Sequence, residues 1–251
     1  MDIAARQAGG KAVLKASTQK LALPDPQCSR MSYSVRRYWV DEFFFRNISR
    51  LPVNSRVIDV GGLKSKKRGQ FDLGKSDLQT IYVNLSTKYQ PDVQADVAAI
   101  PFQDEIFDVA ICSELLEHVY DPKTVLCEIL RVLRCGGRLL VTVPFLYRIH
   151  GDPGDYGRYT DSFWFSVLKE VGFDEIVVER QGLFFSVLAD FGKQYVDRIS
   201  LRKKPFSRIV ASWFVAIFQR WALKYEQRPQ VRADSFLRSF TTGFGIVAVK
   251  R

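Results

Sequence analysis

An acidic residue and two glycines follow directly after a short apolar segment. The run Arg56-Val57-Ile58-Asp59-Val60-Gly61-Gly62 is rich in β-branched side chains and ends in the glycine pair. This pattern predicts a buried parallel strand, and the glycines allow the backbone to turn sharply and to approach a ligand closely. Such a motif is shared by many nucleotide-binding proteins, so it indicates a binding turn without identifying the ligand.

A polar loop from His150 to Thr160 carries side chains suited to proton transfer. His150 is the only histidine in this loop, and an imidazole with a pKa near 6.5 can serve as a general base. Asp155 could orient the imidazole or bind acceptor hydroxyls. The alternative is structural, with Arg158 paired to Asp155 and Thr160 capping the next helix.

Strand and helix patterns alternate around these motifs. Further buried strands are expected at 80–85, 107–112, 138–143, 175–178 and 245–249, and helices at 31–51, 121–135 and 162–171. Asp121-Pro122 is typical of a helix start, and Gly136-Gly137 is expected to end that helix. The alternation predicts an α/β fold with helices on both faces of a parallel sheet, and ligands bound beyond the carboxyl ends of the strands.

Four short segments together resemble the core of class I S-adenosylmethionine-dependent methyltransferases of the type 11 group. They are Asp96-Val97-Ala98-Ala99-Ile100-Pro101-Phe102, Phe107-Asp108-Val109, Ser113-Glu114-Leu115-Leu116-Glu117-His118-Val119 and Leu130-Arg131-Val132-Leu133-Arg134-Cys135-Gly136-Gly137. The resemblance covers about residues 53–182 and the final strand. It implies a Rossmann-like sheet of seven strands with the last one antiparallel, and S-adenosyl-L-methionine as the cofactor.

The resemblance also implies which residues hold the cofactor. These are Asp59, Gly61, Gly62, Asn84, Asp96, Val97, Ser113 and Leu115. The glycine turn would approach the methionine part, with Lys64 and Ser65 near its carboxylate. Asp96 would accept a hydrogen bond from the adenine amino group, unless it is an ordinary loop aspartate that caps a turn.

Two positions depart from the family pattern. Leu63 stands where another glycine is usual, and Asn84 stands where an acid usually binds both ribose hydroxyls. An amide can accept from one hydroxyl and donate to the other. These departures keep open a non-catalytic binding or scaffold protein that retained the fold.

The loop at His150 resembles the His-x-x-Pro-x-Asp-Tyr-x-Arg-Tyr/Phe-Thr loop of a type 11 subgroup found with genes for surface polysaccharide and glycan assembly. The resemblance places this loop at the carboxyl end of the fifth strand, facing the transferable methyl group. We therefore expect His150 and Asp155 to act in O-methylation of a sugar, glycan or other small polar acceptor. For His118, which the family often places near the site, a packed and hydrogen-bonded histidine is the alternative.

Composition limits the domain organisation and the compartment. The 251 residues, 47% apolar and 25% charged, suit one α/β domain over residues 31–251 with an elaboration. Residues 1–30 are expected to form a flexible lead. The four cysteines fit no metal spacing, so no metal is expected. No segment reaches roughly 18 uncharged apolar residues, and we therefore expect a cytoplasmic protein that is soluble or peripheral at the inner face of the membrane.

Most of the net charge of +10 lies in residues 184–238, a basic and aromatic-rich stretch inserted before the last strand. From Lys193 to Arg238 there are eleven basic and three acidic residues, a balance of +8. An apolar helix flanked by cations can pack on its own domain, form a homodimer through 200–230, or lie in a membrane interface. A nucleic-acid methyltransferase is the weakest alternative, because no nucleic-acid motif accompanies the charge.

Overall fold

The computed structural model describes residues 33–65, 68–151, 154–199 and 205–251, with the backbone alone at 199 and 205–208. The expected N-terminal lead, residues 1–30, lies outside the described residues. The described strands form one sheet in the order β3-β2-β1-β4-β5-β7-β6. They are β1 (Arg56–Val60), β2 (Gln79–Asn84), β3 (Val93–Gln94), β4 (Phe107–Ser113), β5 (Leu133–Pro144), β6 (Phe173–Gln181) and β7 (Gly243–Lys250).

The topology confirms the expected Rossmann-like methyltransferase sheet. Strand β7 pairs antiparallel with both β5 and β6, whereas the pairs among β1 to β5 are parallel. The order reverses between β1 and β4, so the glycine turn after β1 stands beside the switch point. Open α/β sheets bind their ligands at this point.

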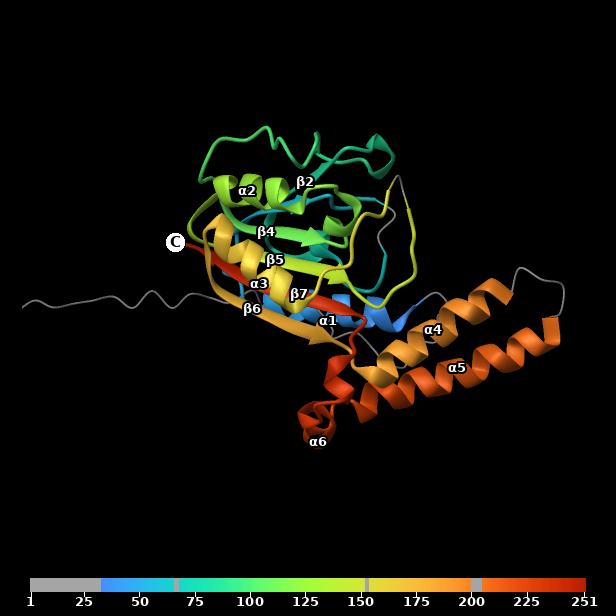
Figure 1. Cartoon of the computed structure of the whole chain (residues 1–251). Helices are drawn as coiled ribbons and strands as arrows, with labels where there is room; N and C mark the ends of the chain where they lie inside the picture. Colours follow the sequence, from blue (N-terminus) through green and yellow to red (C-terminus); the bar gives the residue numbers. More distant parts are fainter. Residues whose placement is uncertain (1–32, 66–67, 152–153, 200–204) are drawn as a thin grey trace, which may run out of the picture.

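Helices cover both faces of the sheet (Figure 1). Helices α2 (Pro122–Val132) and α3 (Asp161–Val171) lie on one face, where Leu126, Ile129 and Trp164 pack among buried strand residues. Helix α1 (Val35–Ile48) covers the other face, where Phe43 and Phe44 join a second core. These two cores hold the strand ends that carry the site.

The observed helix ends follow capping chemistry. Asp121 caps α2 with its side chain on the Lys123 N–H. The expected end at Gly136-Gly137 is wrong, because α2 ends at Val132, where Leu133 turns to an extended conformation and begins β5. Thr160 caps α3, as the structural alternative for that residue predicts, and accepts from the Phe163 N–H at 3.4 Å.

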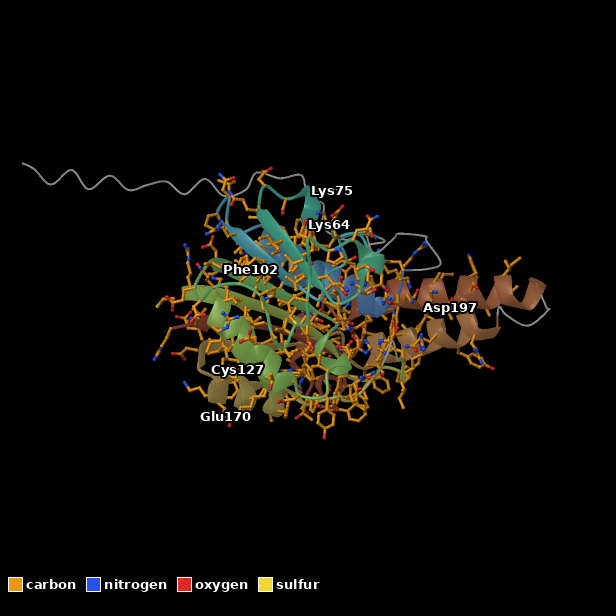
Figure 2. The ribbon with its side chains drawn as sticks, turned by 90° about the horizontal axis from the view of Figure 1, so that it is seen from above. Lys64, Lys75, Phe102, Cys127, Glu170 and Asp197 are labelled. Carbon is orange, nitrogen blue, oxygen red and sulfur yellow. The ribbon has the colours of Figure 1, made fainter. Side chains whose placement is uncertain are left out.

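The insertion before the last strand is helical, with α4 (Phe184–Ile199), α5 (Pro205–Tyr225) and α6 (Pro229–Ala233). Helices α4 and α5 form a hairpin that extends away from the sheet (Figure 1), and Figure 2 shows Asp197 near its far end. Ala189, Ala222 and Leu223 anchor the hairpin base against α1. No helix of the described chain is long and apolar enough to span a membrane.

The hairpin exposes many apolar side chains. Packing on the domain, one of the arrangements predicted for this apolar helix, would cover them. Trp213 and Phe214 are 61% and 62% exposed. We call the full set the exposed apolar residues of the hairpin: Leu188, Phe191 and Tyr195 on α4, and Ile209, Val210, Trp213, Phe214, Ile217 and Trp221 on α5. Packing on the domain therefore accounts for only part of this insertion.

Candidate active site

A cavity of about 900 Å³ opens where β1, β2 and β4 end. It gathers nearly all of the residues predicted from the sequence, which come from separate segments of the chain. Lining it are Asp59, Gly61, Gly62, Asn84, Asp96, Val97, Ser113, Leu115 and His150. Asp155 is not among the residues that line the cavity.

The turn after β1 requires glycine at two successive positions. Gly61 has φ +76°, and an added Cβ would lie 2.7 Å from the Leu115 side chain. A Cβ on Gly62 would lie 2.2 Å from the Asp59 carboxyl group. The missing side chains let the backbone lie close against both neighbours and leave room for a ligand beside the turn.

Asn84 holds this turn from the end of β2. Its Nδ2 donates to the Gly61 carbonyl at 2.9 Å and to the Gly62 carbonyl at 3.1 Å, and its Oδ1 accepts from the Ser86 N–H at 2.9 Å. Both amide hydrogens are therefore used inside the protein. This arrangement does not support the expected donation from Asn84 to a ribose hydroxyl. Oδ1 has a second lone pair, which can accept a hydrogen bond.

Asp96 caps its turn and also lines the cavity. Its Oδ1 accepts from the Ala98 N–H at 2.9 Å, which caps the local turn, and the residue also lines the cavity next to the buried Val97. Ile100, four residues further along the chain, is buried in the core. Lys64, expected near the cofactor carboxylate, forms an ion pair with Asp92.

Glu114, directly after β4, joins the cavity to helix α1. Its carboxylate accepts two hydrogen bonds from the buried Arg36, at 2.5 and 3.2 Å. Its backbone has φ 50°, which is strained for a side chain other than glycine. Burial would raise the pKa of Glu114, but the charge and hydrogen bonds of Arg36 outweigh it and hold that pKa below its usual value.

The strand ends and α1 complete the cavity wall. Ser113 Oγ lies 3.1 Å from Thr142 Oγ1, and Leu115 packs against the glycine turn. On α1, Arg37 lines the cavity, whereas Tyr38 is buried. Tyr33, which precedes α1, donates to Asp41 at 2.9 Å.

The loop after β5 places His150 at the cavity and holds it through Asp155. The Asp155 carboxylate accepts from the His150 backbone N–H at 2.8 Å and from Arg158 through both of its terminal nitrogens. The pairing of Arg158 with Asp155 is the one that the structural alternative predicts, and Asp155 Oδ2 also lies 3.4 Å from His150 Nδ1, where it can orient the imidazole. Binding of acceptor hydroxyls by Asp155 stays a prediction. Burial lowers the pKa of His150, despite the raising effects of the Arg148 carbonyl and of Asp155, so the imidazole is neutral near pH 7.

Two acidic or basic neighbours lie beside His150: Glu117, which was not assigned a role from the sequence, and His118, which was expected near the site or as a packed, hydrogen-bonded histidine. The buried Glu117 has its Oε1 3.6 Å from His118 Nε2, and the rings of His118 and His150 lie 5.0 Å apart between centroids. Burial, and then the charge of Glu114, raise the pKa of Glu117 to about 8. An acid beside one of only two histidines in the chain was the available signal.

The residues of the cavity fit S-adenosylmethionine. The glycine turn is a cradle that two Cβ atoms would fill, and Asp59, Asp96 and Glu114 bring carboxylates to the wall of a site for a cationic sulfonium. Val97 and Leu115 add apolar surface for a flat ring. This combination of fold and cavity is that of a nucleotide-cofactor site at a sheet switch point.

A methyltransferase-domain family matches residues 69–141. Similar curated proteins include the ubiquinone/menaquinone biosynthesis C-methyltransferases UbiE of Xylella fastidiosa, 28% identical over 128 residues, and of Pectobacterium carotovorum, 28% identical over 192 residues. These alignments cover 44% and 68% of this chain. The chain spans 50% of the first relative and 72% of the second.

Solved structures show the same fold. The [4+2]-cyclase SpnF is 21% identical with a TM-score of 0.54, and the match covers 85% of this chain and 81% of that one. A phosphoethanolamine N-methyltransferase of Haemonchus contortus, solved with S-adenosyl-L-methionine, is 17% identical with a TM-score of 0.52, covering 88% and 58%. At these identities the structures support the architecture alone.

The fold and the cavity define the class of cofactor-binding α/β proteins to which S-adenosylmethionine-dependent methyltransferases belong. The domain match over residues 69–141 and the UbiE relatives add a likeness to methyltransferases, and this likeness supports a methyltransferase enzyme with S-adenosyl-L-methionine as its cofactor.

Proposed function

We propose that this protein transfers a methyl group from S-adenosylmethionine to a hydroxyl of a small polar acceptor, such as a sugar or glycan. The observation that carries the proposal is the shared cavity, which brings the glycine turn and Asp96 together with His150 from the loop after β5. Bound S-adenosylmethionine would supply an electrophilic methyl group on its sulfonium.

The residues of the chain would hold the cofactor and prepare the acceptor. The backbone at Gly61 and Gly62 would lie against the methionine part, and Asp96 and Val97 would hold the adenine. His150, neutral near pH 7 and fixed by its loop, is placed to receive the proton of an acceptor hydroxyl. The partly exposed Tyr147 and the exposed Tyr156 flank this end of the cavity, and aromatic faces suit sugar rings.

Calorimetric titration with S-adenosylmethionine and S-adenosylhomocysteine tests the cofactor site. We expect both to bind, and we expect Asp96→Asn to weaken both by about tenfold, equivalent to about 1.4 kcal/mol. The same preparation, incubated with glycans and lipid-linked saccharides, would then be assayed for S-adenosylhomocysteine release. A folded protein that binds neither compound would instead be a scaffold, as Leu63 and Asn84 allow.

Methyl transfer to carbon is the second candidate, favoured by the names of the UbiE relatives. The position of the transferred methyl group in the product decides between them. A methyl ether would be cleaved by boron tribromide with return of the free hydroxyl, whereas a C-methyl group would remain.

We further propose that the hairpin of α4 and α5 rests on an anionic membrane surface, where lipid-linked acceptors would be presented. Its exposed apolar residues include aromatic side chains suited to headgroup depth, and Arg198 and Lys224 are exposed on the same two helices. Part of the predicted contact region, residues 200–204, lies outside the described residues. A second copy of the chain is the competing occupant.

A further inference from the structure

Both histidines of the chain meet at the cavity, together with a buried acid. His118 follows β4, and His150 lies in the loop after β5. One possible ligand atom from each of Glu117, His118 and His150 lies within 4.8 Å of the others. This separation is close to what a single cation can draw together, because ligands at about 2.1 Å from a metal lie roughly 3 to 4 Å apart.

The hydrogen bonds of both imidazoles leave one ring nitrogen of each ready to bind a metal. His118 Nδ1 lies 2.5 Å from the Gly154 carbonyl oxygen, and His150 Nδ1 lies 3.2 Å from the Arg148 carbonyl oxygen. A carbonyl oxygen only accepts, so His118 Nδ1 carries the hydrogen and His118 Nε2 has a lone pair. His150 Nδ1 faces two acceptors, the Arg148 carbonyl and Asp155 Oδ2 at 3.4 Å, as well as the donor Arg158 Nη2 at 3.4 Å, and the two acceptors favour the hydrogen on Nδ1 and a lone pair on Nε2. Metal-binding histidines are typically oriented in this way by a backbone carbonyl or carboxylate.

Glu117 supplies an independent indication that a ligand belongs here. Its side chain is 1% exposed, and neither carboxylate oxygen has a hydrogen-bond partner among the described residues. Its Oε1 points to His118 Nε2 at 3.6 Å, beyond hydrogen-bond distance. A buried acid without a hydrogen-bond partner is costly, and a bound cation would satisfy both of its oxygens in the ionised form.

We propose that Glu117, His118 and His150 form a binding site for one divalent transition-metal cation, such as Mn²⁺ or Zn²⁺. Two imidazoles and one carboxylate are a ligand set that such cations prefer, and three protein ligands leave positions open. His118 and His150 line the cavity, so the open positions face the place proposed for the acceptor.

This inference rests on the proposed function and specifies how the acceptor is held. The cation would bind oxygen atoms of the acceptor, which favours acceptors with two neighbouring hydroxyls, as sugars have. A hydroxyl bound to a cation loses its proton to solvent more readily. The deprotonated oxygen would form its bond to the methyl carbon as the carbon–sulfur bond breaks and leaves its electron pair on sulfur. With a cation bound, His150 would serve as a ligand, and the proton that the proposed function assigns to His150 would go to solvent.

Metal binding is tested on the full chain after treatment with a chelator and its removal. We expect calorimetry to give one Zn²⁺ and, separately, one Mn²⁺ per chain. With ¹⁵N-labelled histidine, the chain gives only two sets of imidazole signals. We expect Zn²⁺ to shift the Nε2 signal of both rings and Mn²⁺ to broaden both, which distinguishes this site from binding by cysteines.

Two variants separate a metal ligand from a structural residue. Glu117→Gln keeps the shape of the buried side chain, and we expect it to weaken Zn²⁺ binding by more than about tenfold, as we expect for His150→Asn. Glu170→Gln removes an exposed acid on α3 and should bind Zn²⁺ like the natural chain. Circular dichroism establishes that each variant is folded.

The inference is overturned if the folded natural chain binds neither cation, if binding leaves both imidazole signals unmoved, or if Glu117→Gln and His150→Asn bind as tightly as the natural chain. Titration of the same samples with S-adenosylmethionine keeps the two proposals apart. Cofactor binding without metal binding would retain the methyltransferase and remove the metal site. Metal binding without cofactor binding would retain the metal site and remove the methyltransferase.

Discussion

Asn84 donates both of its amide hydrogens to the carbonyls of the glycine turn. A carboxylate at this position has no hydrogen to donate, and it would face two carbonyl oxygens. We therefore expect Asn84→Asp to weaken S-adenosylmethionine binding by about tenfold, measured by calorimetry. Tighter binding by this variant would mean that contact with the ribose outweighs the support of the turn.

Gly62 is the position where a side chain meets the Asp59 carboxyl group most directly. Gly62→Ala would push either that carboxyl or the turn out of place, and we expect cofactor affinity to fall by more than about tenfold. Gly192→Ala on α4 is the matched control, since its Cβ would make an ordinary contact at 3.7 Å with Val215. Equal cofactor affinity in the two variants would contradict the importance of the turn.

At the scale of residues, the sequence was sufficient to predict which positions meet and insufficient to predict what they do. The meeting of the glycine turn, Asp96 and His150 at one cavity could be predicted, because their motifs were each assigned to the carboxyl end of a strand or to the loop after it. The role of Asn84 depends on the direction in which its side-chain amide points. The lack of a hydrogen-bond partner for the Glu117 carboxyl group depends on which side chains pack around it. Such facts arise only from the packed structure.

The element α1 is tied to the end of β4 by the Arg36 and Glu114 ion pair. Arg36 is 4% exposed, so Arg36→Met would leave the Glu114 carboxylate without its partner, and we expect a loss of about 3 to 5 kcal/mol in the free energy of unfolding. Urea denaturation measures this change. Adding Glu114→Gln to Arg36→Met should recover part of it, whereas Lys123→Met, in an exposed pair, should leave the midpoint unchanged.

The same ion pair predicts an acid dependence of stability. The folded pKa of Glu114 lies below its unfolded value of 4.5, so the pair stabilises fully above that value and its contribution is lost as the pH falls further. We expect the free energy of unfolding of the natural chain to decrease more steeply below pH 4.5 than that of the Arg36→Met/Glu114→Gln chain. Parallel slopes would mean that other carboxyl groups dominate.

At the scale of elements, capping residues proved better guides than glycines. Asp121-Pro122 correctly predicted the start of α2, because an N-cap and a first-turn proline satisfy the local backbone. The expected end at Gly136-Gly137 failed because Leu133 already pairs with Phe107 of β4, and sheet pairing is a tertiary contact.

For the whole molecule, the hairpin provides the test of membrane contact. The double variant Trp213→Ser/Phe214→Ser removes two exposed aromatic side chains, each contributing roughly 2 kcal/mol if inserted. We expect it to lose sedimentation with vesicles of phosphatidylcholine and phosphatidylserine that the natural chain retains. Phe165→Ser, on the exposed side of α3, is the control and should still sediment.

Two outcomes would contradict membrane contact. The natural chain could fail to sediment with these vesicles, or light scattering could show a dimer that the double variant abolishes. The second outcome would assign the exposed apolar residues of the hairpin to another copy of the chain.

At this scale the alternation of strands and helices was sufficient to predict an α/β sheet, and the resemblance to class I methyltransferases supplied the seven strands with the last one antiparallel. The surface exposure of α5 could not be predicted, because an apolar helix that is buried and one that is exposed contain the same types of residue. Only its position beyond the end of the sheet distinguishes an uncovered helix from a core helix (Figure 1).

Arg36 is shared by the hairpin and the cavity. Its backbone N–H donates to Asp190 of α4 at 3.3 Å, while its side chain holds Glu114 at the cavity wall. A displacement of α4 would therefore act on the cavity wall through the hydrogen bonds of this one residue. If the hairpin rests on a membrane as proposed, that contact would be linked through Arg36 to the wall of the proposed cofactor cavity.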